Sequence, residues 1–268
     1  RNPIRADERL MRPTLIPSLV TATAANLKHS RSVRFFEIAP VYLSREDAVL
    51  PDEPSTLAVV VAGEREPFGR FTPTAASGAG GLDFFDLKGI VDSTLVRAGA
   101  GAATWEPTSH PALHPGRSAT IGVDGKVVGI AGELRPEVAA AAGIDDVRVG
   151  VAEIDLTGLY QLVAATPPIA ISVPRFLPVE QDFAVVVDAA RPAAEVEGAL
   201  RDGAGSLVTG VTLFDVYSGP QVGAGKKSLA YRVTFTAPDR ALTDSELRKV
   251  RKRIERTLAQ RVGGTLRA

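Results

Sequence analysis

The sequence of 268 residues contains no cysteine, which excludes disulfide bonds, thiolate metal ligands and a cysteine nucleophile. No apolar run approaches the ~20 residues that a membrane-spanning helix requires, so we expect no membrane partner. The first residues, Arg1 to Arg5, lack the apolar segment of a signal peptide. The chain also begins without methionine, which indicates a fragment or a processed product. We therefore expect a cytoplasmic protein.

Motifs for nucleophilic or metal-assisted catalysis are also missing. The chain has no Gly-x-Ser-x-Gly turn of the hydrolase type. His110 and His114 stand four residues apart, but Pro111 and Pro115 exclude a helix that would bring both imidazoles to one face. No carboxylate cluster stands at ligand spacing, so we favour a structural role for both histidines and predict no metal site.

The segment Gly225–Ser228, which reads Gly-Lys-Lys-Ser, resembles a phosphate-binding loop in composition only. The leading glycine of such a loop would fall on Pro220, and a second lysine follows the Gly-Lys pair where serine or threonine is required. We interpret Lys226 and Lys227 as solvated residues at a hairpin tip. There they can contact the phosphates of a nucleic-acid backbone.

The formal net charge of zero hides an uneven distribution. Residues 171–268 contain 15 of the 31 basic and 11 of the 31 acidic residues, a balance of +4, which leaves −4 for residues 1–170. A basic C-terminal part is compatible with a polyanionic partner. The composition is that of a globular protein, and the length allows one large domain or two ordinary ones.

Hydrophobic periodicity predicts both helices and strands in the first 170 residues. Asp124-Gly125 is the strongest hairpin signal in the chain. The predicted helices span residues 9–27, 84–99 and 136–142. The predicted strands span residues 33–43, 56–63, 118–123, 127–131 and 147–156, of which 56–63 is continuously apolar and so central. A polar loop at 44–55 and a mobile connection rich in Gly, Ala and Ser at 72–81 join them.

A proline-containing segment, Ala164–Val173, marks the predicted boundary between two domains. After it the elements follow the order β-α-β-β-α-β, which is the ferredoxin-like arrangement. Its long helix, Leu242–Val262, begins with a capping box from Thr243 to Glu246. The strands are predicted at residues 182–188, 211–217, 228–236 and 265–267, and the first helix at 192–200. We expect an antiparallel sheet with both helices on one face and the other face open.

The hairpin Val211–Ala237 carries the side chains of greatest functional interest. If Phe214 and Val216 point into the core, alternation places Asp215, Tyr217 and Ser228 together on the open face. An exposed tyrosine can stack on a base. The carboxylate can accept from the amino group of guanine or cytosine, and the hydroxyl can donate or accept. Tyr217 is equally compatible with a strand-end residue that covers a loop.

The long helix carries many basic side chains, and two interpretations of them stay open. They form either the solvated outer face of an amphipathic helix or a stripe that contacts phosphates. The residues are Arg248, Lys249, Arg251, Lys252, Arg253, Arg256 and Arg261.

Characteristic stretches occur in one order along essentially the whole chain. In the first part they are Asn2-Pro3, Met11–Leu19, Phe36–Tyr42, Asp83–Gly89, His110–Ala119 and Gly132–Val138. In the second part they are Leu213–Tyr217, Gly225–Ala230 and Ala237–Asp244. Together they resemble the C-terminal third of the β subunit of bacterial phenylalanyl-tRNA synthetase.

The resemblance implies an α+β protein with two domains. Residues 1–170 would form an N-terminally incomplete, class II aminoacyl-tRNA-synthetase-like module, an antiparallel sheet with flanking helices that is not catalytic. Residues 174–268 would form a ferredoxin-like βαββαβ domain that binds the anticodon. The family enzyme is an α2β2 heterotetramer that uses ATP and Mg²⁺. We expect this segment to bind neither, because Arg45 is the only basic residue in the loop Ser44–Ser55.

The resemblance also implies particular tRNA-binding residues. Carried over by position, the base-contacting residues are Ala184, Asp215, Tyr217 and Ser228. Lys226, Lys227 and Arg240 are candidates for contacts to phosphates. One departure weakens the expectation of phosphate contacts from the first strand, because Glu180-Gln181 precede Asp182 where the family often has basic residues.

The function implied is that of a non-catalytic part of phenylalanine–tRNA ligase. It would dock the catalytic α subunit and bind the tRNA(Phe) anticodon. An alternative is a stand-alone RNA-binding or regulatory interaction module that reuses the ferredoxin-like domain. A third hypothesis, an independent ATP-using ligase, is disfavoured by the missing basic loop.

Overall fold

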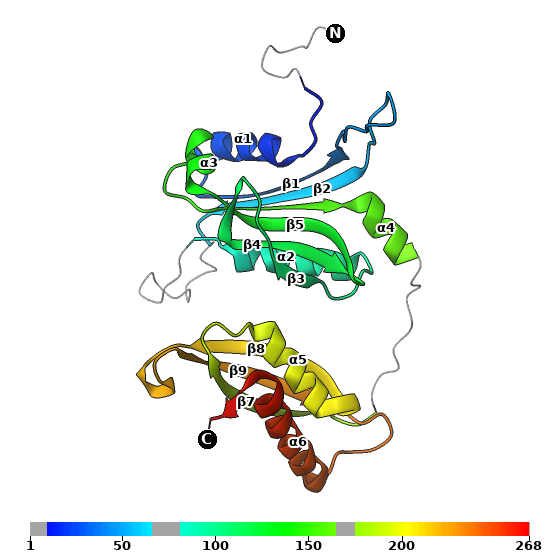
Figure 1. Ribbon diagram of the computed structural model, residues 1–268, viewed down its shortest axis with the longest axis vertical. Coiled ribbons are helices and arrows are strands. Elements are labelled where there is room, and N and C mark those ends of the chain that lie inside the picture. Colours follow the sequence, from blue (N-terminus) through cyan, green and yellow to red (C-terminus); the bar gives the residue numbers. More distant parts are fainter. Residues whose placement is uncertain (1–9, 66–80, 165–174, 268) are drawn as a thin grey trace. The chain divides into compact units, whose positions relative to one another are not determined.

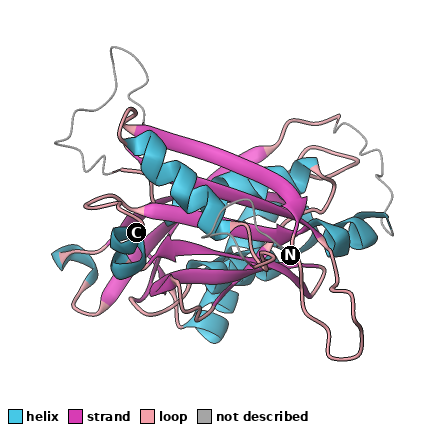
Figure 2. Ribbon diagram, turned by 90° about the horizontal axis from the view of Figure 1, so that it is seen from above, coloured by secondary structure: helices cyan, strands magenta, loops and turns pink. Residues whose placement is uncertain are grey.

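The computed structural model describes residues 10–65, 81–164 and 175–267, which form helices and strands in two compact units (Figures 1 and 2). Unit 1 spans residues 1–169 and unit 2 spans residues 170–268. Most of the predicted connection at 72–81 and of the predicted boundary at 164–173 lies outside the described residues. None of the described helices combines the length and apolarity that a membrane crossing needs.

Unit 1 is built on a six-stranded sheet in the order β1-β2-β6-β5-β4-β3, in which every neighbouring pair is antiparallel. The strands are β1 (Ser32–Pro40), β2 (Ser55–Gly63), β3 (Thr104–Pro107), β4 (Leu113–Val123), β5 (Lys126–Leu134) and β6 (Val149–Asp155). Four helices flank the sheet: α1 (Ile16–Leu27), α2 (Phe84–Arg97), α3 (Pro136–Ala141) and α4 (Leu156–Ala164).

Strand β2 is buried on both faces, as its continuous apolar sequence predicted. Leu57, Val59 and Val61 pack in one cluster with residues of α2 and α4. The alternate residues Ala58 and Val60 pack in a second cluster with α1 and α3. The helix pairs α1/α3 and α2/α4 therefore cover opposite faces of the sheet (Figure 1).

Helix α1 begins at Ile16, so the prediction that it begins at Arg9 was wrong. A carboxylate from the far strand β6 fixes its start. Glu153 accepts hydrogen bonds from the Leu15 N–H at 2.6 Å and from the Thr14 hydroxyl at 2.8 Å. Because this anion satisfies a free N–H at the positive end of the helix dipole, it also favours a helix start at this point.

The turn between β4 and β5 confirms the Asp124-Gly125 hairpin. Both residues have positive φ, 48° and 74°, which the two-residue hairpin turn requires. Three other features of this unit were not predicted. Strand β4 begins at Leu113 rather than Ser118, because an irregularity in its register interrupts the alternation. Strand β3 and helix α4 were also missed.

Unit 2 has a four-stranded antiparallel sheet in the order β10-β7-β9-β8. In chain order its elements are β7 (Val179–Asp188), α5 (Ala193–Ala204), β8 (Val208–Tyr217), β9 (Lys226–Phe235), α6 (Asp244–Val262) and β10 (Thr265–Leu266). Both helices share one core with the sheet. The predicted ferredoxin-like arrangement and the α+β class are confirmed.

The two helices of unit 2 approach each other closely at Gly203. A Cβ atom placed on this glycine would lie 2.7 Å from the Ile254 Cα of α6. Beside this contact the Arg253 guanidinium donates hydrogen bonds to the carbonyls of Gly203 and Ala204, the last residues of α5. One basic residue of α6 is thus used to cap a helix end.

We expect Gly203→Ala to lower the free energy of unfolding of unit 2 by about 1–3 kcal/mol, because the added methyl group forces the helices apart. Gly198→Ala in the same helix is the matched control, since nothing lies within 4 Å of its new Cβ. That control should be neutral or stabilising by roughly 0.5–1 kcal/mol.

Urea unfolding followed by circular dichroism measures the change. The fluorescence of Trp105, the only tryptophan, reports on unit 1 separately. Equal effects of the two substitutions would contradict the close approach of α5 and α6.

Candidate nucleic-acid interface

In the described part of unit 2, both helices pack on the same face of the sheet and none covers the other face. On β7, Phe183, Val185 and Val187 point into the core that α5 and α6 share with the sheet. Their neighbours on β7, Asp182 and Ala184, therefore point to the opposite face. We call this second face, formed by β7, β8 and β9 away from α5 and α6, the open face.

The register of the strands arranges the predicted site residues in two adjacent rows on the open face. Ala184, Ala230 and Asp215 lie directly opposite one another across β7, β9 and β8. In the next row Ser228 on β9 pairs with Tyr217 on β8. The sequence reasoning thus named residues that the pairing brings together from three strands.

The four residues differ in exposure. Asp215 is exposed, and Ala184 and Tyr217 are half-buried. Ser228 is only 5% exposed, so it lies on the expected face but is not open to solvent in this state. The Tyr217 ring lies against the backbone of Gly219, since a Cβ there would meet its hydroxyl at 2.3 Å. Tyr217 therefore covers the loop after β8 and keeps part of its ring accessible.

Phe214 does not point into the core, and the prediction that it does was wrong. Leu213 pairs with Tyr231 and Asp215 pairs with Ala230, so one extra residue, Phe214, is inserted between them as a β-bulge. The bulge breaks the alternation on which the prediction rested. Phe214 is 54% exposed.

The ring of Phe214 contacts a charged pair on the open face. The Arg232 guanidinium lies 5.6 Å from the ring centroid. Its Nε and Nη2 atoms donate to the two carboxylate oxygens of Asp182, at 2.9 and 3.0 Å. These hydrogen bonds lower the pKa of Asp182 and raise that of Arg232. Phe214 and Arg232 were not predicted as site residues, because their contact depends on the β8 bulge and on the pairing of β7 with β9.

The two histidines in the His-Pro segment of unit 1 have local structural roles. The Nδ1 atom of His110 accepts from the Ala112 N–H at 3.3 Å, and that of His114 accepts from the Gly116 N–H at 3.1 Å. No group of three or more potential metal ligands is found in the described part of the chain.

Comparison with known proteins identifies the family. A model described as the phenylalanyl tRNA synthetase beta chain CLM domain matches residues 1–156. A model of the ferredoxin-fold anticodon binding domain matches residues 174–267. The chain belongs to the phenylalanyl-tRNA synthetase β-chain family.

Relatives named phenylalanine–tRNA ligase beta subunit match the chain over its full length. The protein of Moorella thermoacetica is 39% identical over 100% of this chain and 32% of its own length. That of Symbiobacterium thermophilum is 40% identical over 100% and 29%, and that of Pseudomonas fluorescens is 39% identical over 99% and 32%. The chain thus spans about a third of the length of these synthetase β subunits.

In the synthetase-like unit 1, the loop between β1 and β2 does not fit an ATP site. Its one basic residue, Arg45, is paired with Asp47 at 3.0 Å and with Asp52 at 3.2 Å. These contacts raise the pKa of Arg45 and lower that of Asp47. Because both nearby acids already neutralise the guanidinium, no free cation of this loop is left for a triphosphate.

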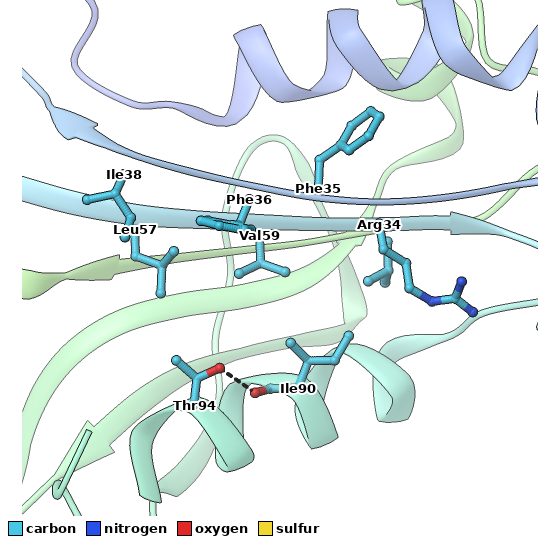
Figure 3. Close-up of a pocket in the computed structure, with 9 residues that line it drawn as sticks. Arg34, Phe35, Phe36, Ile38, Leu57, Val59, Ile90 and Thr94 are labelled. Carbon is cyan, nitrogen blue, oxygen red and sulfur yellow. Dashed lines mark hydrogen bonds between the residues drawn. The ribbon is translucent and has the colours of Figure 1, made fainter. Parts of the chain in front are cut away.

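Unit 1 carries an apolar groove along its edge strand β1, with a volume of about 350 Å³ (Figure 3). Leu57, Val59 and Ile90 line the groove between the sheet and α2. Phe36 and Ile38 stand at its rim and are 71% and 57% exposed. A groove with exposed large apolar side chains is typical of a surface that another protein covers.

The three residues predicted to contact phosphates differ in exposure and in whether their charge is already paired. Lys226 is exposed and Lys227 is half-buried, and neither forms an ion pair with another described residue. Arg240 is engaged, because its guanidinium pairs with Glu246 and with Asp239. A phosphate would have to compete with these carboxylates for Arg240.

The basic side chains of α6 also fall into a group that is paired within the chain and a group for which no pairing is found. Arg253 caps α5, Arg251 pairs with Glu255 at 3.3 Å, and Arg261 pairs with Asp202. The side chains for which no pairing is found among the described residues are those of Arg248, Lys249, Lys252 and Arg256. Most of this helix face is thus a solvated or internally paired surface on the side of the sheet opposite the open face.

The capping box at the start of α6 gives a pH-dependent prediction. Glu246 accepts from the Thr243 N–H at 3.0 Å and pairs with Arg240, and these contacts lower its pKa from 4.5 to about 2. A carboxylate whose pKa is lowered by folding stabilises the folded state above the unfolded value. This stabilisation is lost as the pH falls from 4.5 towards 2.

We expect the side-chain carboxyl carbon of Glu246 to titrate near pH 2 in NMR spectra. Arg240→Gln should raise this midpoint only part of the way, since the backbone hydrogen bond remains. A midpoint near 4.5 in the unchanged chain would exclude the capping box in solution.

Proposed function

We propose that this chain acts within phenylalanine–tRNA ligase, where residues 174–268 bind the tRNA(Phe) anticodon and residues 1–170 dock the catalytic α subunit. In this proposal the enzyme is a cytoplasmic α2β2 assembly that joins phenylalanine to tRNA with ATP and Mg²⁺. The segment described here binds neither ATP nor Mg²⁺. Its contribution is to position the tRNA and the partner subunit.

The observation that carries the anticodon proposal is the arrangement of the open face. Ala184 and Ala230 form a floor of small side chains, on which a base can lie flat. Asp215 stands beside this floor with its carboxylate exposed and can accept a hydrogen bond from the amino group of guanine or cytosine. The partly exposed ring of Tyr217 offers a stacking surface in the next row.

Ser228 would contact a base only after a side-chain rearrangement on binding. Ser228 is buried and pairs with Tyr217, so a base reaches its hydroxyl only if neighbouring side chains move. Rotation of a side chain at an interface is common when a partner binds. Lys226 lies two residues before Ser228 on β9, is exposed, and can contact the backbone phosphates of bound nucleotides.

The docking proposal is supported by the apolar groove of unit 1. Phe36 and Ile38 expose large apolar surfaces on β1, an edge strand of the sheet among the described residues. Arg45 is neutralised within its loop, which argues for a scaffold rather than a nucleotide site. A catalytic subunit that covers this groove would bury both residues.

Tyr217→Ala and Asp215→Ala are each expected to weaken binding of tRNA(Phe) by about 1–3 kcal/mol, through the loss of one stacking surface or one base-reading acceptor. Val216→Ala is the matched control, because Val216 lies between them on β8, is 55% exposed and pairs with Leu229 towards the other face. Fluorescence anisotropy with labelled tRNA(Phe) measures the affinity.

A tRNA(Phe) with a changed anticodon serves as the second control. It should bind the unchanged chain more weakly than tRNA(Phe) does, because the Asp215 carboxylate loses the amino group that it accepts from. If neither substitution alters binding while circular dichroism shows an intact fold, the anticodon proposal fails.

For the docking surface, Ile38→Lys should weaken association with the α subunit at least about tenfold, because a buried apolar side chain of this size contributes ~1.5–3 kcal/mol. Val127→Lys is the control, since Val127 is 67% exposed on the β4–β5 hairpin outside the groove. Co-purification and calorimetric titration measure the association. A chain that binds tRNA(Phe) but never the α subunit would instead be a stand-alone RNA-binding module.

A further inference from the structure

The β-bulge on β8 turns a large aromatic ring towards the open face instead of the core. Full burial of a phenylalanine side chain stabilises a fold by about 1.5–3 kcal/mol. Phe214 is 54% exposed and gains little of this. The next residue, Asp215, returns to the regular register opposite Ala230. The bulge therefore adds one aromatic ring to the open face without displacing the residues after it.

Arg232 holds a fixed position beside this ring. Two parallel hydrogen bonds to Asp182 fix the plane of the guanidinium, and Glu180 approaches it at 3.8 Å. Half of the Arg232 side chain and 54% of Phe214 are exposed, so parts of both the guanidinium and the ring are accessible to a base. Single-stranded bases stack both on aromatic rings and on guanidinium planes.

We propose that Phe214 and Arg232 form a second base-stacking platform on the open face. It would hold a nucleotide next to the one bound at Asp215 and Tyr217. This inference rests on the proposed anticodon-binding function, which it extends from a one-base site to a site for two splayed bases.

The spacing along the strands supports two separate bases. Arg232 and Ser228 are four residues apart on β9, or about 13 Å at ~3.3 Å per residue. Stacked bases are about 3.4 Å apart. One base therefore cannot stack on both Tyr217 and Arg232, and Asp215, opposite Ala230, lies between these two rows. Two nucleotides whose bases are unstacked and laid on the sheet fit this distance, as in other four-stranded RNA-binding sheets.

The electrostatics favour stacking over a phosphate contact at this platform. Asp182 and Glu180 together neutralise Arg232, whereas Lys226 at the other end of β9 has no carboxylate partner among the described residues. A neutralised guanidinium adds little to the salt-dependent attraction of a polyanion. Its stacking contribution does not depend on a free charge.

The test compares four variants of the complete chain: Phe214→Ala, Phe214→Leu, Tyr217→Ala and the control Val216→Ala. Phe214→Ala should weaken tRNA(Phe) binding by about 5- to 150-fold, the range of a lost base–aromatic stack. Phe214→Leu should lose nearly as much, because leucine restores the apolar volume but not the ring. The salt dependence of binding should stay unchanged in both Phe214 variants.

Three further tRNA(Phe) molecules, each lacking the base at one anticodon position, locate the contacts. The effect of Phe214→Ala should vanish with the tRNA that lacks the base stacked on Phe214. The effect of Tyr217→Ala should vanish with a different one of the three. Circular dichroism checks that each variant is folded.

Other results would contradict either the second platform or the anticodon-binding function. If Tyr217→Ala weakens binding and Phe214→Ala does not, the second platform is wrong and the anticodon function stands. If neither does, the anticodon function itself fails. If Phe214→Ala acts equally on all three modified tRNAs, or weakens only association with the α subunit, Phe214 is not a base platform.

Discussion

The packing of α5 and α6 on a single face of the second sheet is the constraint on which the candidate interface depends. Their close contact at Gly203 and Ile254 lets both helices share one core with Phe183, Tyr231 and Phe235. Every second residue of β7 and β9 points into that core. The residues between them point to the opposite face, where small, acidic and aromatic side chains lie opposite one another.

In unit 1 the helices pack on both faces of the sheet rather than on one. Its inner strand β2, next to the edge strand β1, is buried on both faces, because helices cover the sheet on both sides. Of the exposed large apolar side chains of unit 1, Phe36 and Ile38 stand beside the groove on the edge strand β1. One unit thus offers a polar, aromatic sheet face and the other an apolar edge groove. These surfaces suit an RNA and a protein partner respectively.

The sequence predicted best what local chemistry determines. The turn at Asp124-Gly125 and the capping box from Thr243 to Glu246 follow from a few adjacent residues, and both are present. What it missed depends on distant partners. The start of α1 is set by Glu153, more than 130 residues away. The exposure of Phe214 follows from a bulge that appears only when β8 is aligned with β9.

The same bulge has a second consequence, for solubility. Strand β8 is the outer strand of its sheet and carries Leu213, Phe214 and Val216 with substantial exposure. A regular apolar edge of this kind is a template for strand addition by another chain. The extra residue interrupts the row of backbone donors and acceptors and bends the strand at its most apolar point. An insertion that turns Phe214 to the open face thus also disfavours edge-to-edge association.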